Sequence, residues 1–253
     1  MQIRSEKSIY FKQLLLDIIL FMKVDEFNFN LDPTRIAQTP YQKRDRAKLL
    51  VCNKATNSLT DHYFSDILAY FKPGDVLVLN NSKVVPFRLH GKKETGGLIE
   101  VLLLKPHSEN IYVSLTKPQK KLKVGTTITF SDKLMAKVVE LQSEGITLLE
   151  LKYSGNLFEI LDEIGEMPLP PYIKTKCENK ADYQTVYAKI NGSAAAPTAG
   201  FHFTPELLSK LKAKGVEIAE VTLHVGLGTF LSVRSQTIEE HQMHRETFCI
   251  EDA

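Results

Sequence analysis

Three histidines stand in contexts that could support proton transfer. His202 lies between Phe201 and Phe203, His224 lies in an apolar run with strand-like alternation, and His244 lies in a polar segment. An imidazole titrates near neutral pH, so each could accept or donate a proton. His202, His224 and His244 are therefore candidate catalytic residues. The sequence does not assign their separate roles, and the alternative for each is an ordinary core or surface histidine.

A run of small residues precedes His202. From Gly192 to Gly200 no side chain is larger than Thr or Pro. Such a run buries little apolar area, so core packing does not explain it, whereas glycine lets another molecule approach the backbone. Thr204 and Pro205 then mark the start of a helix, whose N-terminus suits a polar or charged ligand. The run predicts a ligand site, with a tight structural loop as the alternative.

A second loop of this kind, residues 226–230, follows an expected strand over 216–225. It contains Gly-x-Gly but lacks the third glycine and the following helix of a dinucleotide fingerprint, so we interpret it as another place where the backbone is approached closely. His241 and His244 have the i, i+3 spacing of metal ligands on a helix. No cysteine is near them, and no metal is expected.

Composition places the chain among ordinary globular proteins. It has 253 residues, 43% hydrophobic and 25% charged, with a net charge of +2. This charge is too small to indicate nucleic-acid binding, so any basic surface must be local. Lys43–Lys48 and Lys117–Lys123 are the candidates, and a solvated charged face is the alternative. The three cysteines are far apart, which indicates neither disulfides nor zinc and fits a reducing cytoplasm.

The remaining pattern predicts an α/β fold with a mixed sheet and an inserted small β-barrel. Residues 76–79 form a continuous apolar run, typical of a strand buried on both faces, and Asn80 follows at its end. Short β-type runs with turn signals recur over residues 87–153 and favour a small barrel or a sandwich, of which we expect the barrel. Helices are expected over 64–71, 156–164 and 205–214. The expected domains are 22–86 with 154–253 as a discontinuous catalytic domain and 87–153 as the barrel.

Several segments resemble one family. Residues 183–188 (YQTVYA), Gly192-Ser193, residues 195–200 (AAPTAG) and residues 202–204 (HFT) are similar to the signature of S-adenosylmethionine:tRNA ribosyltransferase-isomerases. Residues 36–40, followed by the basic stretch, and residues 80–88, 167–173 and 241–246 are also family-like. The family usually has an acidic residue at the position of Asn81, which puts a role for that side chain in doubt.

The resemblance implies a transferase of queuosine biosynthesis. Its members transfer and isomerise the ribosyl moiety of S-adenosylmethionine onto 7-aminomethyl-7-deazaguanine in the tRNA anticodon. The products are epoxyqueuosine, adenine and methionine. S-adenosylmethionine is then a co-substrate, with no other cofactor, and the partners are this tRNA and S-adenosylmethionine.

The expected contacts follow from the same resemblance and from the two loops. The expected substrate-binding residues are Tyr183, Gln184, Thr185, Tyr187, Gly192, Ser193, Ala195, Ala196, Pro197, Thr198, Gly200, Phe201, Phe203, Thr204, Gly226, Gly228, Thr229, Phe230, Asn80 and Arg88. Those expected to contact tRNA are Lys43, Arg44, Arg46, Lys120 and Lys121.

The resemblance runs from Met22 to about Ile250. We therefore expect residues 1–21 to be an extension outside the family domain, and the chain to be truncated at its C-terminus relative to the family. A truncated, non-catalytic tRNA-binding relic is the alternative function. A methyltransferase is disfavoured because no early glycine-rich loop precedes an acidic strand end. We expect a cytoplasmic monomer without a membrane segment, since the apolar run 14–21 is too short to span a bilayer.

Overall fold

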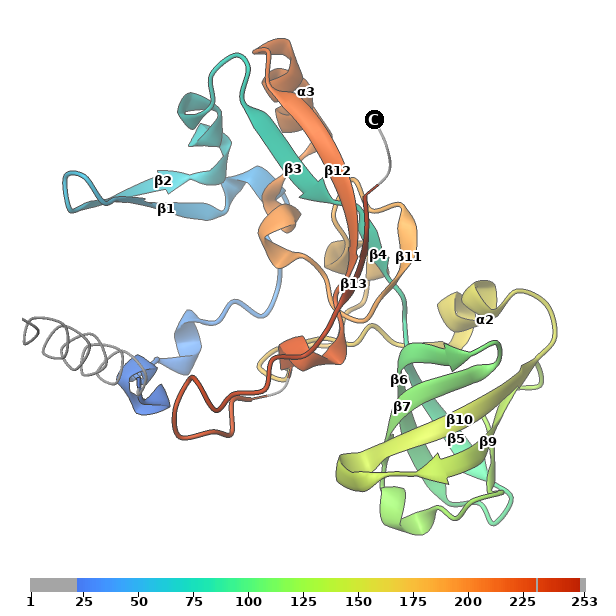
Figure 1. Ribbon diagram of the computed structural model, residues 1–253. Helices are drawn as coiled ribbons and strands as arrows, with labels where there is room; N and C mark the ends of the chain where they lie inside the picture. The colour runs from blue at the N-terminus through green and yellow to red at the C-terminus, as the bar shows by residue number, and fades with distance from the viewer. Residues whose placement is uncertain (1–21, 231, 251–253) are drawn as a thin grey trace, which may run out of the picture.

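The computed structural model describes residues 22–230 and 232–250, so the predicted extension 1–21 lies outside the described part (Figure 1). An α/β body with small mixed sheets is joined to a closed β-barrel, which confirms the predicted fold class. Within the described residues, no helix is long and apolar enough to cross a membrane.

The barrel is a closed antiparallel sheet in the order β10-β7-β6-β5-β8-β9. Leu134, Ala136 and Val138 alternate inward along β9 and are buried, as the period of two predicts. Gly91 permits close packing inside, because a Cβ there would lie 2.6 Å from Cγ2 of Ile128. The strands are β5 (Arg88–Lys93), β6 (Leu98–Ser108), β7 (Ile111–Lys117), β8 (Thr127–Thr129), β9 (Leu134–Leu141) and β10 (Ile146–Tyr153).

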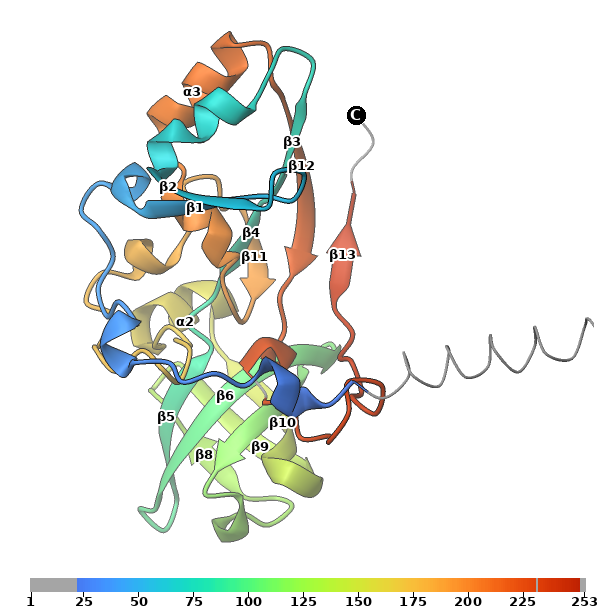
Figure 2. The same ribbon diagram turned by 90° about the vertical axis from the view of Figure 1, so that its left-hand side faces the viewer.

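The body centres on a three-stranded sheet of β3 (Val76–Asn80), β12 (Glu217–His224) and β13 (Thr247–Cys249). β12 runs parallel to β3 and antiparallel to β13. The helix α3 (Pro205–Ala213) and the 3-10 helix η4 (Phe64–Tyr70) lie together beside this sheet (Figure 2). The buried core that they share contains Phe64, Leu79, Phe203, Leu207, Leu211 and Val216.

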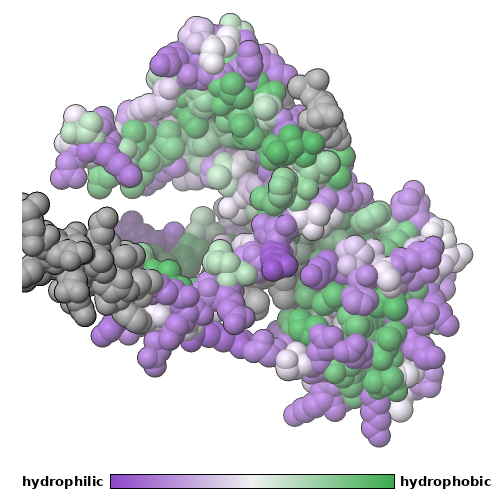
Figure 3. All heavy atoms as spheres, in the orientation of Figure 1, coloured by the Kyte–Doolittle hydropathy of each residue, from purple (hydrophilic) through white to green (hydrophobic). Residues whose placement is uncertain are grey.

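The expectation that the first apolar strand is buried on both faces is wrong. Val76 is 53% exposed and Val78 is 58% exposed, whereas Leu79 is buried. Among the described elements, α3 and η4 pack on one face of the sheet. On the other face, which is turned toward the viewer in Figure 3, apolar side chains are exposed. An unbroken apolar run indicates a hydrophobic strand, but it does not indicate whether other elements cover one face of the strand or both.

Smaller elements complete the fold. β4 (Ser82–Val84) pairs in parallel with β11 (Ile190–Ser193), and β1 (Lys48–Asn53) pairs with β2 (Ser58–Tyr63) as a hairpin. The helix α2 (Leu157–Ile164) begins at Asn156, whose side chain accepts a hydrogen bond from the backbone N of Phe158, as its cap-like position predicts. The other 3-10 helices are η1 (Val24–Phe27), η2 (Pro33–Arg35), η3 (Arg44–Arg46), η5 (Gln119–Lys121), η6 (Ser143–Gly145), η7 (Lys180–Tyr183), η8 (Thr198–His202) and η9 (Leu227–Phe230).

Candidate active site

The carboxyl end of β12 brings together two loops that the sequence singles out. His224 is the last residue of β12, and Gly192 and Ser193 end the neighbouring strand β11. The buried Ser193 hydroxyl accepts a hydrogen bond from the backbone N of Val225 at 3.0 Å, and its Oγ lies 2.5 Å from Oγ of Ser82. Through these two contacts, the Ser193 hydroxyl links β11 to β4 and to the residue that follows β12.

The His224 ring lies against the backbone of Gly192. Gly192 has φ +148°, and a Cβ there would lie 2.7 Å from Cε1 and 2.8 Å from Nδ1 of His224. Burial lowers the pKa of His224, which keeps the ring neutral at pH 7. Its Nδ1 is buried and makes no hydrogen bond to any described residue. A neutral imidazole of this kind is suited to accepting a proton.

His244 and Glu246 form a second polar group beside the loop that follows β12. Nε2 of His244 lies 3.2 Å from Oε1 of Glu246, and the same oxygen accepts a hydrogen bond from the backbone N of Gly226 at 2.8 Å. A Cβ at Gly228 would lie 2.0 Å from Cγ of His244. The carboxylate thus orients the imidazole through Nε2, and the glycine leaves room for the ring.

The segment around His244 differs from the helix that its histidine spacing suggested. Residues 241–246 are irregular and lead into β13 at Thr247. The i, i+3 spacing of His241 and His244 therefore has no helical geometry. Glu246 was not among the predicted site residues. Its sequence signals were its place at the end of the family-like segment 241–246 and its position two residues after a candidate histidine.

Residues 193–196 and Gly200 of the small-residue run are buried, so core packing explains this part of the run, contrary to expectation. Residues 194–196 are at most 8% exposed, and Ala196 belongs to a cluster with Val84, Met167 and Tyr183. The protein itself comes close to this backbone, because large side chains from other segments fill the space. The residues of the run that remain open are Thr198 and Ala199, which are exposed, and Gly192 and Pro197, which are half-buried.

The family-like segment 183–188 holds this run in place. The side-chain amide of Gln184 donates to the backbone O of Val84 at 2.6 Å and accepts from its N at 3.0 Å. A Cβ at Gly200 would lie 2.0 Å from the Tyr187 hydroxyl. Burial raises the pKa of Tyr183 and of Tyr187 to about 12, so both phenols are neutral. Their substrate contacts remain predictions.

The aromatic residues around His202 take part in packing. The His202 ring centroid lies 5.2 Å from that of Phe64, and the buried Phe203 makes an edge-to-face contact with Phe64 at 4.9 Å. Phe201 is half-buried against Tyr183 at 5.5 Å. Burial and then the charge of Arg44 lower the pKa of His202. Of the two flanking rings, Phe201 is the more accessible to a ligand.

The sequence profile of one family, described as "Queuosine biosynthesis protein", matches residues 24–253. This chain belongs to that family. The S-adenosylmethionine:tRNA ribosyltransferase-isomerase of Clostridioides difficile (strain 630) is 52% identical over 231 residues, which cover 90% of this chain and 68% of that protein. The crystal structure of the S-adenosylmethionine tRNA ribosyltransferase from Thermotoga maritima shares 33% identity, with a TM-score of 0.33. That match covers 79% of this chain and 58% of the solved one.

In this queuosine biosynthesis family member, Asn80 makes backbone-like contacts. Its side-chain amide donates to the backbone O of Leu223 at 2.9 Å and accepts from the N of Leu223 at 3.0 Å. The side chain thereby extends the pairing of β3 with β12. Arg88, the first residue of β5, pairs with Glu100 at 3.2 Å. Both residues remain predicted substrate contacts.

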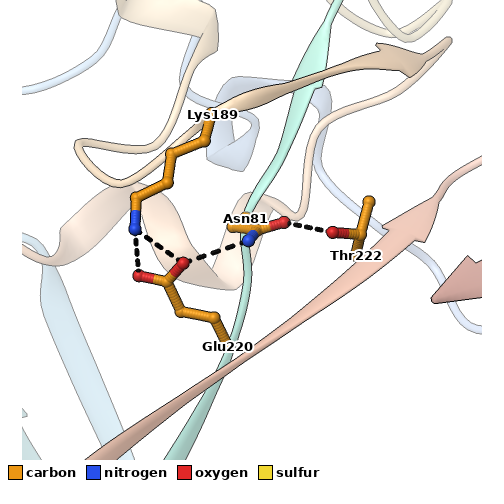
Figure 4. Close-up of polar contacts among 4 residues, drawn as sticks. All are labelled: Asn81, Lys189, Glu220 and Thr222. Atoms are coloured by element: carbon orange, nitrogen blue, oxygen red, sulfur yellow. Dashed lines mark hydrogen bonds and ion pairs between the residues drawn. The ribbon is translucent and has the colours of Figure 1, made fainter. Parts of the chain in front are cut away.

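Asn81 lies in a polar network beside β12 (Figure 4). Its amide N donates to Oε2 of Glu220 at 3.0 Å, and its amide O accepts from the Thr222 hydroxyl at 2.7 Å. Lys189 Nζ lies 2.6 Å and 2.7 Å from the two oxygens of Glu220. The hydrogen bonds from Lys189 and then Asn81 lower the pKa of Glu220. Here the amide, unlike an aspartate, offers a donor to the neighbouring carboxylate.

The side chains predicted to contact tRNA differ in how far other groups of the protein already bind their charged ends. Nη1 of Arg44 donates to the backbone O of Gln184 at 2.6 Å, and Nη2 donates to that of Ala181 at 2.7 Å. Arg46 is exposed, 5.3 Å above the ring of Tyr63. Lys43 lies 3.9 Å from Asp45, and Lys120 and Lys121 lie in η5.

Replacing Arg44 with methionine is expected to lower the free energy of unfolding by about 2 kcal/mol, because carbonyl acceptors lose charged donors. Arg46→Met is the matched control, with an expected change of about 0.5 kcal/mol. Urea unfolding measures both variants. Equal losses would show that the backbone bonds of Arg44 contribute no more than the exposed contact of Arg46.

Proposed function

We propose that this chain transfers and isomerises the ribosyl unit of S-adenosylmethionine onto 7-aminomethyl-7-deazaguanine in a tRNA anticodon. Epoxyqueuosine, adenine and methionine are the products. Family membership supports the reaction class. The observation that carries the assignment of the site is the pairing of two histidines with two glycines at the end of β12. His224 lies on Gly192, and His244 lies on Gly228.

The chemistry makes specific demands on these side chains. The sulfonium of S-adenosylmethionine acidifies the adjacent C–H, so the reaction needs a base, and the departing adenine needs a proton. We propose His224 as the base, because burial keeps it neutral and its Nδ1 has no partner in the described part of the chain. We propose His244 as the proton donor, oriented by the carboxylate of Glu246. No further cofactor is needed in this scheme.

Product analysis tests the proposal directly. Purified protein is incubated with S-adenosylmethionine and a tRNA carrying 7-aminomethyl-7-deazaguanine, and the small molecules are separated by chromatography. We expect adenine and methionine in equal amounts. S-adenosylhomocysteine would instead indicate methyl transfer. Binding of this tRNA without any turnover would indicate the non-catalytic alternative. Activity retained after dialysis against a chelator would support a reaction without a metal.

A further inference from the structure

A groove of about 800 Å³ lies between the barrel and the proline-rich connector, residues 167–177. We call it the connector groove. Arg88, Glu100 and Lys117 line it from the barrel, and Lys174 and Lys176 line it from the connector. Lys117 belongs to the candidate basic stretch 117–123, whereas Lys174 and Lys176 were not predicted to contact RNA. Cationic side chains outnumber carboxylates along the groove, and part of its lining is apolar. Grooves that bind nucleic acid share both features.

The acidic residues of the groove are already paired. Glu100 pairs with Arg88 at 3.2 Å, and Glu163 pairs with Lys133 at 2.9 Å. The third, Glu166, lies 3.3 Å from the His90 ring. Each carboxylate therefore has a cationic or hydrogen-bonding neighbour of its own.

Four lysines of the groove have no such counter-charge. Within residues 22–230 and 232–250, no carboxylate lies within 4.0 Å of Nζ of any of them. Nζ of Lys174 and Nζ of Lys180 donate to the backbone O of Pro171 and of Asp162, respectively, and these bonds leave their charge uncompensated. The four are Lys117, Lys174, Lys176 and Lys180. Uncompensated ammonium groups on both walls favour a polyanion that passes between them.

Between the lysines the groove is apolar. Leu102 and Leu115 lie on the barrel side, and Leu169 and Ile173 lie on the connector side. Grooves that hold a single strand of nucleic acid combine cations for the phosphates with side chains, usually aromatic, on which the bases stack. Here the cations are present and the floor that the described residues form is aliphatic, so it offers the bases an apolar surface without stacking rings. An acidic peptide would use the lysines without needing the floor.

The connector wall is fixed at two points. The side-chain amide of Gln38 donates to the backbone O of Tyr172 at 3.1 Å and accepts from the N of Lys174 at 2.7 Å. At the other end, the backbones of Arg88 and Glu166 exchange hydrogen bonds of 3.2 Å and 2.8 Å. Prolines also restrict the segment between these points. The backbone that carries the lysines of the wall therefore needs little ordering when a ligand binds, and the cost is limited to the lysine side chains.

We infer that the connector groove binds the sugar-phosphate backbone of an unpaired strand of the substrate tRNA, through Lys117, Lys174, Lys176 and Lys180. This inference rests on the proposed function, since it takes tRNA as the occupant. It assigns the RNA contact to the space between the two parts of the fold, in addition to the basic stretches at residues 43–48 and 117–123.

The test compares two double charge reversals in the full chain. Lys174→Glu with Lys176→Glu changes the groove, and Lys137→Glu with Lys152→Glu makes the same charge change on β9 and β10, where both lysines are exposed. Affinity for the tRNA is measured by fluorescence anisotropy between 50 and 200 mM salt. We expect the groove variant to bind at least about tenfold more weakly, with a salt slope smaller by about two. The control should change by no more than about twofold.

Gln38→Ala adds a readout for the wall itself. It should weaken binding a few-fold and leave the salt slope unchanged, because the lysines remain and only their positions loosen. Melting temperatures establish that each variant is folded.

The outcomes separate this inference from the proposed function. Equal affinity and salt slope for the groove variant and the control would overturn the connector groove, even if the wild-type chain releases adenine. A groove variant that alone loses tRNA affinity would support the groove, even if no adenine is released. Poly-glutamate is the second probe. Binding as tight as that of tRNA, with the same loss in the groove variant, would indicate a general polyanion site and overturn the assignment to RNA.

Discussion

Replacing Gly228 by alanine is expected to lower kcat for adenine release by at least about 100-fold. The new methyl group would lie 2.0 Å from Cγ of His244, so the imidazole must move away from its contact with Glu246. A shift of about 1 Å in a catalytic group is enough for a loss of this size. The measurement is single-turnover release of adenine with saturating substrates.

Gly226→Ala is the matched control in the same loop. Among the described residues, a Cβ at Gly226 would come within 4 Å of Oε1 of Glu246 alone, at 3.9 Å, which is ordinary contact. We expect its kcat to stay within about threefold of wild type, because the backbone N that binds Glu246 is retained. The double variant Gly228→Ala with His244→Ala should be no slower than His244→Ala alone. A Gly228→Ala chain that is folded and fully active would remove His244 from the mechanism.

The barrel could be predicted because its information is local. Along β9, Leu134, Ala136 and Val138 alternate with exposed neighbours, and turns separate β9 from β8 and β10. Cap positions were equally readable, as the Thr204 hydroxyl accepting from the N of Leu207 illustrates. Both signals depend on residues close together in sequence.

The small-residue run shows where local information ends. A run of alanine and glycine predicts that something comes close to the backbone, but it does not identify the neighbour. Here Tyr183 and Val84 pack around Ala196, and the Tyr187 hydroxyl fills the space beside Gly200. As a result, Ala196→Leu would be a core substitution. We infer that it would destabilise the fold by about 1–3 kcal/mol through overpacking.

Hydrogen bonds from side chains to backbone far away in the sequence also could not be predicted. Gln38 reaches the connector 134 residues away, and Gln184 pairs with Val84 across 100 residues. A glutamine in a polar segment has no periodicity that would reveal such a partner. The same holds for Glu246, whose contact with the N of Gly226 depends on the pairing of β12 with β13.

His224→Asn is expected to lower kcat by about 100-fold or more, because the chain loses its proposed proton acceptor. In the wild-type chain, the acidic limb of kcat/KM should have a pKa below about 6.5, since burial disfavours the protonated ring. The loss of rate caused by protonation of His224 should therefore appear only when the pH falls below about 6.5. His107→Asn, at an exposed position on the barrel, is the control and should leave the profile unchanged.

The lowered pKa of His224 should also make the free energy of unfolding depend on pH. This dependence separates a chemical role of the ring from a structural one. When the pH falls below about 6.5, the unfolded chain binds a proton at this position before the folded chain does, so the free energy of unfolding decreases. That stability is present above the unfolded pKa and is lost as the pH falls through the folded one. His202, whose pKa is also lowered, contributes in the same direction. His224→Asn should therefore lose less stability than wild type between pH 7.5 and 5, while its melting temperature at pH 7.5 stays close to that of wild type. If the variant is inactive only in proportion to its unfolded fraction, the imidazole has a packing role and the base must be sought at His202.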